Sequence, residues 1–377
     1  MIDSFFMEPN PIMRHLLSAA VMILCVIALP IAGAQEQRPA ATEQQSRSLS
    51  AADKAAAVDL LAQRLSDKYV FADEGSKMAA AVRDHLLKGD YEKAATGAEF
   101  AGLLTTHIQA AHPDKHLSIR YALNAPPDRP RPSLNQGMPA EMRQRITDMG
   151  QYLNFAFEKV ERLPGNIMYL KLNGFFEADI GKAAATAAMN LAANGNAMII
   201  DLRENRGGDP RMVAHVASYL LGDHKVHLSD IYFRAENETN SFWSDPAVPG
   251  ARFGADKPVY VLTSGETFSA AEDFTYNLQA IKRITVVGET TGGGAHPVQP
   301  FRIDPNLVAM IPVGRSINLI TKGDWEGSGV KPDVAVAADK AMTKANALAL
   351  RQVLPKISNP RERTMLEKKL AELETAL

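Results

Sequence analysis

The stretch VYVLTSGETFSAAEDF (Val259–Phe274) decides the fold. The apolar run Val259–Leu262 is typical of a buried strand, and a helical pattern begins near Ser269. Ser269 is therefore predicted at a strand-to-helix turn, where an α/β protein can expose a serine hydroxyl beside the positive end of a helix dipole. With Glu272 it also fits the Ser-x-x-Glu capping box, which opens many helices that have no catalytic role. The residues alone leave both interpretations open.

A second strand-to-loop junction lies earlier in the chain. The apolar run Ala197–Leu202 is followed directly by RENRGGDP (Arg203–Pro210). Paired glycines let two backbone N–H groups face one point, and an acyl-transfer enzyme needs such donors for its oxyanion. Gly207 and Gly208 are thus candidate oxyanion donors, together with the N–H of Ala270. The alternative is an ordinary tight loop before the next helix.

Strand and helix patterns alternate around these two junctions. Predicted strands lie at 167–172, 197–202, 259–262 and 284–287, with predicted helices at 180–193, 211–221 and 269–281. This βαβ rhythm predicts an α/β domain over residues 166–340, built on a mostly parallel sheet with covering helices. Both candidate donor segments follow strand C-termini, where open α/β sheets bind ligands.

The flanking regions have other patterns. Apolar residues at helical spacing predict a small helical N-terminal domain over residues 51–120, and the Pro-rich segment 121–165 is predicted to be a linker too short for a further domain. Helices are expected over residues 341–377. The last of them has a leucine stripe that could dock on the sheet or on a second subunit, so a homo-oligomer is one candidate assembly.

The N-terminus has the pattern of an export signal. A basic pair precedes the apolar run Leu16–Leu29, and a small-x-small cleavage pattern ends at Ala34. Residues 1–34 are therefore predicted to be a signal peptide, with Met1 or Met13 as its start. Residues 35–50 are predicted to be a flexible leader. We expect an exported protein, periplasmic or secreted, without stable membrane insertion after cleavage.

Composition narrows the partners and cofactors. The chain has 377 residues and a formal net charge of −2, which gives no reason to expect nucleic acid as a partner. Its one cysteine, Cys25, lies inside the apolar run of the signal peptide. The exported chain would therefore have neither disulfides nor thiolate metal sites. No phosphate-binding GxxxxGK[ST] loop occurs, and we expect neither a cofactor nor a metal.

Four motifs together resemble the family of tail-specific (C-terminal processing) and tricorn-type serine peptidases. They are DLRENRGG (Asp201–Gly208), TFSAAEDF (Thr267–Phe274), GETTGGGAHP (Gly288–Pro297) and EGSGVKPDVAV (Glu326–Val336). Their order and spacing match those of the family over roughly residues 50 to 340. The resemblance implies a ClpP/crotonase-like core.

One missing side chain indicates the branch of this family. Tail-specific members pair the serine with a lysine, and Gly294 stands at the matching position. The chain instead resembles the branch of interphotoreceptor retinoid-binding protein and tricorn, without the PDZ insert, which uses a histidine and a glutamate. That resemblance assigns the histidine to His116, in DKHLSIR, and the glutamate to Glu326. His296 is the alternative base, because it lies near the place of the missing lysine.

The resemblance also implies roles. Ser269 is the nucleophile, His116 the general base and Glu326 the carboxylate that orients the imidazole, since a serine hydroxyl needs an adjacent base at neutral pH. The implied activity is peptide-bond hydrolysis, with peptides or unfolded proteins as substrates. The alternative is a noncatalytic binder of a hydrophobic, retinoid- or fatty-acid-like ligand, because fold does not fix function.

Overall fold

A computed structural model describes residues 48–128 and 138–377 of the chain. The predicted signal peptide and nearly all of the predicted leader lie outside the described residues. Within the described ranges, no helix has both the length and the apolar character needed to cross a membrane.

A six-stranded sheet forms the centre of the molecule, with strand order β12-β8-β7-β4-β3-β2. All neighbouring strands run parallel except β2 and β3. The strands are β2 (Phe157–Leu163), β3 (Ile167–Leu172), β4 (Ala197–Asp201), β7 (Val259–Thr263), β8 (Thr285–Gly288) and β12 (Val334–Ala335). The predicted α/β fold with a mostly parallel sheet is confirmed.

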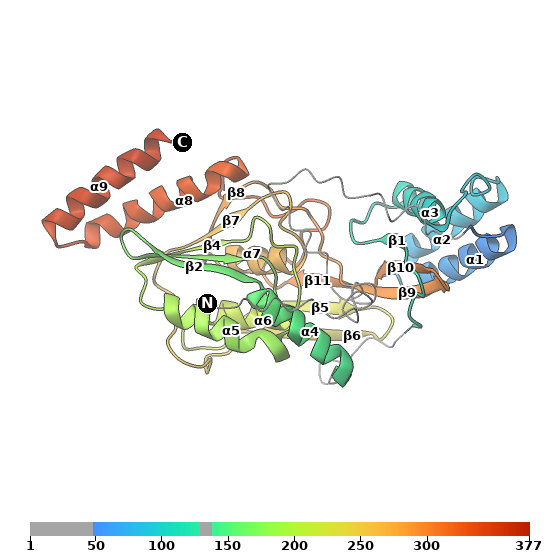
Figure 1. Ribbon diagram of the computed structural model, residues 1–377, viewed down its shortest axis with the longest axis horizontal. Helices are drawn as coiled ribbons and strands as arrows, with labels where there is room; N and C mark the ends of the chain where they lie inside the picture. The colour runs from blue at the N-terminus through green and yellow to red at the C-terminus, as the bar shows by residue number, and fades with distance from the viewer. Residues whose placement is uncertain (1–47, 129–137) are drawn as a thin grey trace, which may run out of the picture.

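Helices cover both faces of this sheet (Figure 1). Alternate residues of β4 enter different cores: Met198 and Ile200 pack on the side of α5 to α7, and Ala197 and Ile199 on the side of α8. Because both faces are buried, the central strands are continuously apolar rather than alternating. The covering helices are α5 (Ala178–Ala192), α6 (Pro210–Ser218), α7 (Ala270–Ala280), α8 (Ala338–Val353) and α9 (Pro360–Thr375), with the short 3-10 turn η4 (Leu354–Lys356) between the last two.

The predicted helical N-terminal region lies at the opposite end of the molecule from α8 and α9 (Figure 1). It contains α1 (Ala51–Lys68), α2 (Ala72–Leu87) and α3 (Gly97–Ala111). Ser50 and Thr96 cap α1 and α3 through complete capping boxes. The helical character that the spacing of apolar residues predicts for this region is therefore confirmed.

Two further three-stranded sheets contact the helices on either side of them: one packs against α1 and the other against α6 and α7. β1 (Ser118–Tyr121), β10 (Leu307–Pro312) and β9 (Val298–Asp304) form one, in the order β1-β10-β9; β11 (Gly314–Asn318), β5 (His227–Phe233) and β6 (Glu238–Trp243) form the other, in the order β11-β5-β6. The pairing of β1 with β10 carries the chain after α3 onto a hairpin from the C-terminal half. This brings residues 114–117 beside the loop 291–297.

The predicted linker over residues 121–165 differs from the structure. Its described part contains α4 (Ala140–Tyr152), the 3-10 turn η3 (Asn154–Ala156) and strand β2, which pairs antiparallel with β3 at the sheet edge. An edge strand is half exposed, and FEKVERL carries four charged residues. These charges hide β2 from a search for apolar runs.

Candidate active site

Ser269 lies between β7 and α7, at the predicted strand-to-helix turn. Its backbone has φ 55° and ψ −122°, a conformation with positive φ that L-residues adopt rarely and that costs on the order of 1–3 kcal/mol. The half-buried side chain stands at the N-terminus of α7, where the helix dipole favours negative charge. Such stored strain is typical of functional sites.

The carboxylate of Glu272 fixes this turn. It is fully buried and accepts hydrogen bonds from the N–H of Ser269 (2.9 Å), the hydroxyl of Thr291 (2.5 Å) and the N–H groups of Gly293 (2.7 Å) and Gly294 (2.9 Å). Burial raises the pKa of Glu272, and the four donors oppose that rise. The capping box is therefore present, and its glutamate also ties the loop 291–294 to the nucleophile turn.

The glycine pair lies against Ser269. Gly207 has φ 107°, and a Cβ there would lie 2.8 Å from both the Cβ of Ser269 and the N of Ala270. Gly208 has φ 141°, and its Cβ would lie 1.9 Å from the carbonyl oxygen of Phe175. Both the backbone conformation and the close approach thus require glycine at these two positions.

Asn205 holds the glycine loop and the nucleophile turn together. Its fully buried side chain donates to the last carbonyl of β3 (2.9 Å) and accepts from the N–H of Gly207 (2.8 Å), while its own carbonyl accepts from the N–H of Phe268 (3.0 Å). The N–H of Gly207 is therefore already engaged. The N–H groups of Gly208 and Ala270 have no hydrogen-bond partner within the described ranges.

His116 approaches the nucleophile turn from the loop after α3. Its ring packs on the ring of Phe268, with centroids 4.6 Å apart, and its Nδ1 is buried without a hydrogen-bond partner among the described residues. Burial lowers the pKa of His116 to about 4, so its imidazole is neutral at pH 7.

Gly294 makes room for this ring. A Cβ at Gly294 would lie 2.6 Å from Cε1 of His116 and 2.2 Å from Cζ of Phe268. Any side chain at position 294 would therefore collide with the histidine. A lysine at position 294 would need the space that the ring of His116 occupies.

His296 occupies a different, more strongly charged environment. Its Nδ1 lies 2.8 Å from Oδ2 of Asp114 and 3.5 Å from Oε2 of Glu326. Burial alone would lower the pKa of His296, but the hydrogen bond and charge of Asp114 and the charge of Glu326 outweigh it, so the pKa is raised. The protonated imidazolium is therefore favoured at His296, in contrast to His116.

Asp114 lies at the centre of this cluster. It is buried and accepts from the hydroxyl of Tyr69 (2.9 Å) and from the backbone N–H of His116 (3.0 Å), in addition to contacting His296. Burial works to raise its pKa, but the contact with His296 and these hydrogen bonds hold the pKa below its usual value. Asp114 therefore remains a carboxylate that fixes both histidine segments.

Glu326 completes the group. Its Oε2 accepts from the N–H of Ala295 (2.5 Å), and one of its oxygens, a ring nitrogen of His116 and an oxygen of Asp114 all lie within 4.8 Å of one another. Burial raises the pKa of Glu326 despite the opposing charge of His296. The structure thus brings the histidines and the carboxylates together.

The hydroxyl of Ser269 makes no hydrogen bond to either histidine in the part of the chain that the structure describes. Reasoning from sequence missed Asp114 as a partner of both histidines and Asn205 as the link between the two loops. Both residues stand inside quoted motifs, and no local spacing predicts their partners.

A mostly parallel α/β sheet with a strained serine at a strand-to-helix turn is an arrangement that α/β hydrolases also use. The model of Peptidase family S41 matches residues 166–336, and the model of the N-terminal domain of Peptidase_S41 in eukaryotic IRBP matches residues 51–163. The chain belongs to peptidase family S41.

Solved structures share this fold. A candidate peptidase from Parabacteroides merdae is 19% identical, with a TM-score of 0.54 over 80% of this chain and 97% of that one. Mature CPAF is 10% identical, with a TM-score of 0.53 over 81% of this chain and 97% of that one. At these identities the likeness extends to the fold alone.

Proposed function

We propose that this chain is an exported serine peptidase in which Ser269 attacks the scissile carbonyl of a peptide or unfolded protein. The observation that carries the proposal is the positive φ of Ser269 at the N-terminus of α7, beside a glycine pair whose missing side chains let Gly207 pack directly against this turn. A serine that only capped the helix would gain nothing from this strain, since an N-cap ordinarily has an extended backbone.

His116 takes the proton of the serine hydroxyl and later gives it to the leaving amine. Its neutral ring is available as a base at pH 7, whereas the hydrogen bond and charge of Asp114 and the charge of Glu326 raise the pKa of His296. The imidazolium that forms on His116 needs a nearby negative charge, and Glu326 supplies it from within 4.8 Å. His296 and Asp114 then act as positioning residues.

The oxyanion is stabilised by the N–H groups of Gly208 and Ala270. We assign this role to Gly208 rather than to Gly207, because the N–H of Gly207 donates to the side chain of Asn205. Ala270 is buried at the start of α7, and backbone hydrogen bonds of Gly207 and Asp209 to Phe175 fix the segment around Gly208, so both proposed donors need no reorganisation as negative charge develops. Water then attacks the acyl-enzyme by the same route, with His116 again as the base.

Labelling with a fluorophosphonate, combined with hydrolysis of an unfolded protein substrate, tests this function. We expect one label per chain on Ser269 and turnover of the substrate. A noncatalytic binder of a hydrophobic ligand would take up a fluorescent fatty acid and leave both readouts blank. Absence of labelling in a folded protein contradicts the proposal.

Export is tested separately. The protein recovered from expressing cells should begin at Gln35, after cleavage of residues 1–34. A chain that keeps Met1 or Met13 and stays in the cytosolic fraction contradicts this part of the proposal, but it leaves the hydrolytic mechanism intact.

A further inference from the structure

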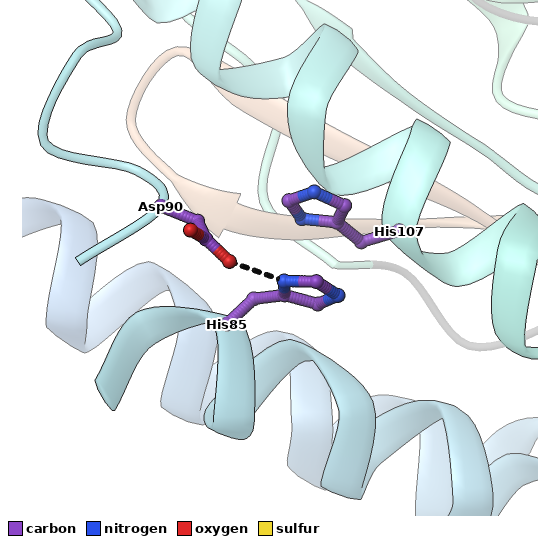
Figure 2. A group of neighbouring side chains, drawn as sticks. All are labelled: His85, Asp90 and His107. Atoms are coloured by element: carbon purple, nitrogen blue, oxygen red, sulfur yellow. Dashed lines mark hydrogen bonds and ion pairs between the residues drawn. The ribbon is translucent and has the colours of Figure 1, made fainter. Parts of the chain in front are cut away.

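Three side chains converge on the helical N-terminal region, and none of them belongs to the proposed peptidase site. His85 lies in the last turn of α2, Asp90 in the following loop and His107 on α3 (Figure 2). The Nδ1 of His85 is 2.6 Å from Oδ2 of Asp90. The two imidazole rings stack with centroids 3.5 Å apart and planes 8° apart.

Backbone geometry creates this convergence. Gly89 has φ 76° and ends α2, and the N–H of Asp90 donates to the carbonyl of His85 (3.1 Å), which turns the loop back over the helix end. Tyr91 is buried, and its carbonyl accepts from the ammonium of Lys54 (3.0 Å). The buried Tyr91 and its hydrogen bond with Lys54 thus fix the loop that carries Asp90.

The same tyrosine orients one of the histidines. The hydroxyl of Tyr91 lies 3.1 Å from Nδ1 of His107. A hydrogen bond of this kind, on one ring nitrogen, fixes the position and tautomer of a metal-binding histidine. Burial raises the pKa of Tyr91, so this hydroxyl stays protonated.

The three side chains also place their possible ligand atoms close together. One nitrogen from each ring and one oxygen of Asp90 lie within 4.8 Å of one another.

We propose that His85, Asp90 and His107 form a binding site for a zinc-class divalent metal ion. Two imidazoles and one carboxylate are the ligands that Zn²⁺ prefers, at about 2.0–2.2 Å, with water in the remaining position. The ion must lie in the plane of each ring it binds, so the parallel rings tilt apart on binding. The side chains of His85 and Asp90 are 29% and 42% exposed, which leaves room for that rotation.

A bound ion would cross-link the end of α2 to α3. The sequence pattern did not suggest it, because the three residues are spread over two helices and a loop. Lys88, two residues before Asp90, is paired with Asp84 at 2.5 Å. The site shares no residue with the group of Asp114, His116 and Glu326, which also contains ligand atoms within 4.8 Å of one another.

Titration of the full chain with ZnCl₂, followed by calorimetry and by thermal unfolding, tests the site. We expect one ion per chain and a rise in the unfolding temperature. The variants H85A and H107A should each weaken binding by about 100-fold or more, since outer-shell partners alone are worth about 10- to 100-fold. D90N should weaken it less, and H224A, at an exposed histidine, should bind as the wild type does.

Three results would overturn the proposal. The wild type may bind no zinc at all, or H85A and H107A may keep its affinity and stoichiometry, or the ion may be lost from H116A instead, which would assign it to the catalytic group. If a variant unfolds, ¹⁵N-histidine NMR of the wild type decides the same question. In that experiment, zinc should shift the ring signals of His85 and His107. Fluorophosphonate should instead shift those of His116 and His296.

Discussion

The two halves of the candidate site are built differently. The nucleophile turn and the glycine loop follow strands of the central sheet. Asn205 joins them through hydrogen bonds, and Glu272 fixes the nucleophile turn. The histidine segment 114–117 follows α3 and reaches the core through side chains of residues far apart in sequence. Asp114 contacts His296, and the ammonium of Lys115 donates to the carbonyl of Gly292.

This difference separates two functions of the fold. In the proposed mechanism, the nucleophile and the oxyanion donors lie in the core, and the base comes from the segment that follows the helical region. Changes in the core should therefore remove chemistry outright, whereas changes at the contact between the halves should weaken it by degrees.

The largest effect is expected from Ser269→Ala. Loss of the nucleophile should lower kcat by on the order of 10⁴-fold or more and abolish fluorophosphonate labelling. Alanine and serine adopt positive φ with similar difficulty, so the substitution leaves the strain of the turn unchanged. The unfolding temperature should therefore stay within a few degrees of the wild type. A variant that keeps near wild-type turnover would contradict the assignment of the nucleophile.

His116→Ala tests whether the docked half supplies the base. We expect a loss in kcat of about 10³- to 10⁴-fold, and little further loss in the double variant with Ser269→Ala, because triad members act as a unit. The control is H224A, which should be fully active. If His116→Ala stays active while His296→Ala is inactive, the base is His296.

The pH profile separates the two histidines without mutation. A base must be deprotonated, so kcat/KM rises as pH increases through its pKa. Burial lowers the pKa of His116 to about 4, which predicts an acid limb well below the ordinary histidine value of about 6.5. The carboxylates raise the pKa of His296, so a limb above 6.5 would assign the base to His296.

Gly208→Ala tests the core half. A methyl group there meets the carbonyl of Phe175 and shifts the proposed donor, so kcat should fall by about 10²- to 10³-fold. The matched control is Gly265→Ala in the nucleophile loop, because a Cβ at Gly265 meets nothing within 4 Å and should leave activity unchanged. A rise in KM alone would indicate a loop that positions substrate instead.

The smallest effect is expected from Lys115→Ala, at the contact between the halves. This exposed ammonium makes one hydrogen bond to the loop that carries Gly294, so we expect a two- to tenfold loss in kcat/KM, the usual range for one such bond. Lys115→Arg should recover part of it. A loss as large as that of His116→Ala would mean that docking is far less stable than the other contacts suggest.

The sequence predicted what local patterns determine. The buried strand before Ser269 and the glycine pair after β4 both lie within one short window, so strand, turn and helix could be inferred together. The strands β5, β6, β9 and β11 were missed, because they form small, half-exposed sheets whose partners are distant in the chain.

The same limit applies to the site. His116 and Glu326 were nominated from motif resemblance, and the structure brings them within 4.8 Å of each other. The cluster of Asp114 with His296 joins residues 182 positions apart, a contact created only by the pairing of β1 with β10. The steric exclusion between Gly294 and His116 likewise exists only in three dimensions.

The strand β1 has a practical consequence for dividing the chain. It covers one edge of β10, whose residues Leu307, Val308, Ala309 and Ile311 are buried. A truncated protein that starts at residue 166 would expose this apolar edge to other molecules, and uncovered edges of this kind template aggregation. This truncated protein should therefore precipitate when produced alone and should become soluble again when residues 48–163 are supplied as a separate fragment.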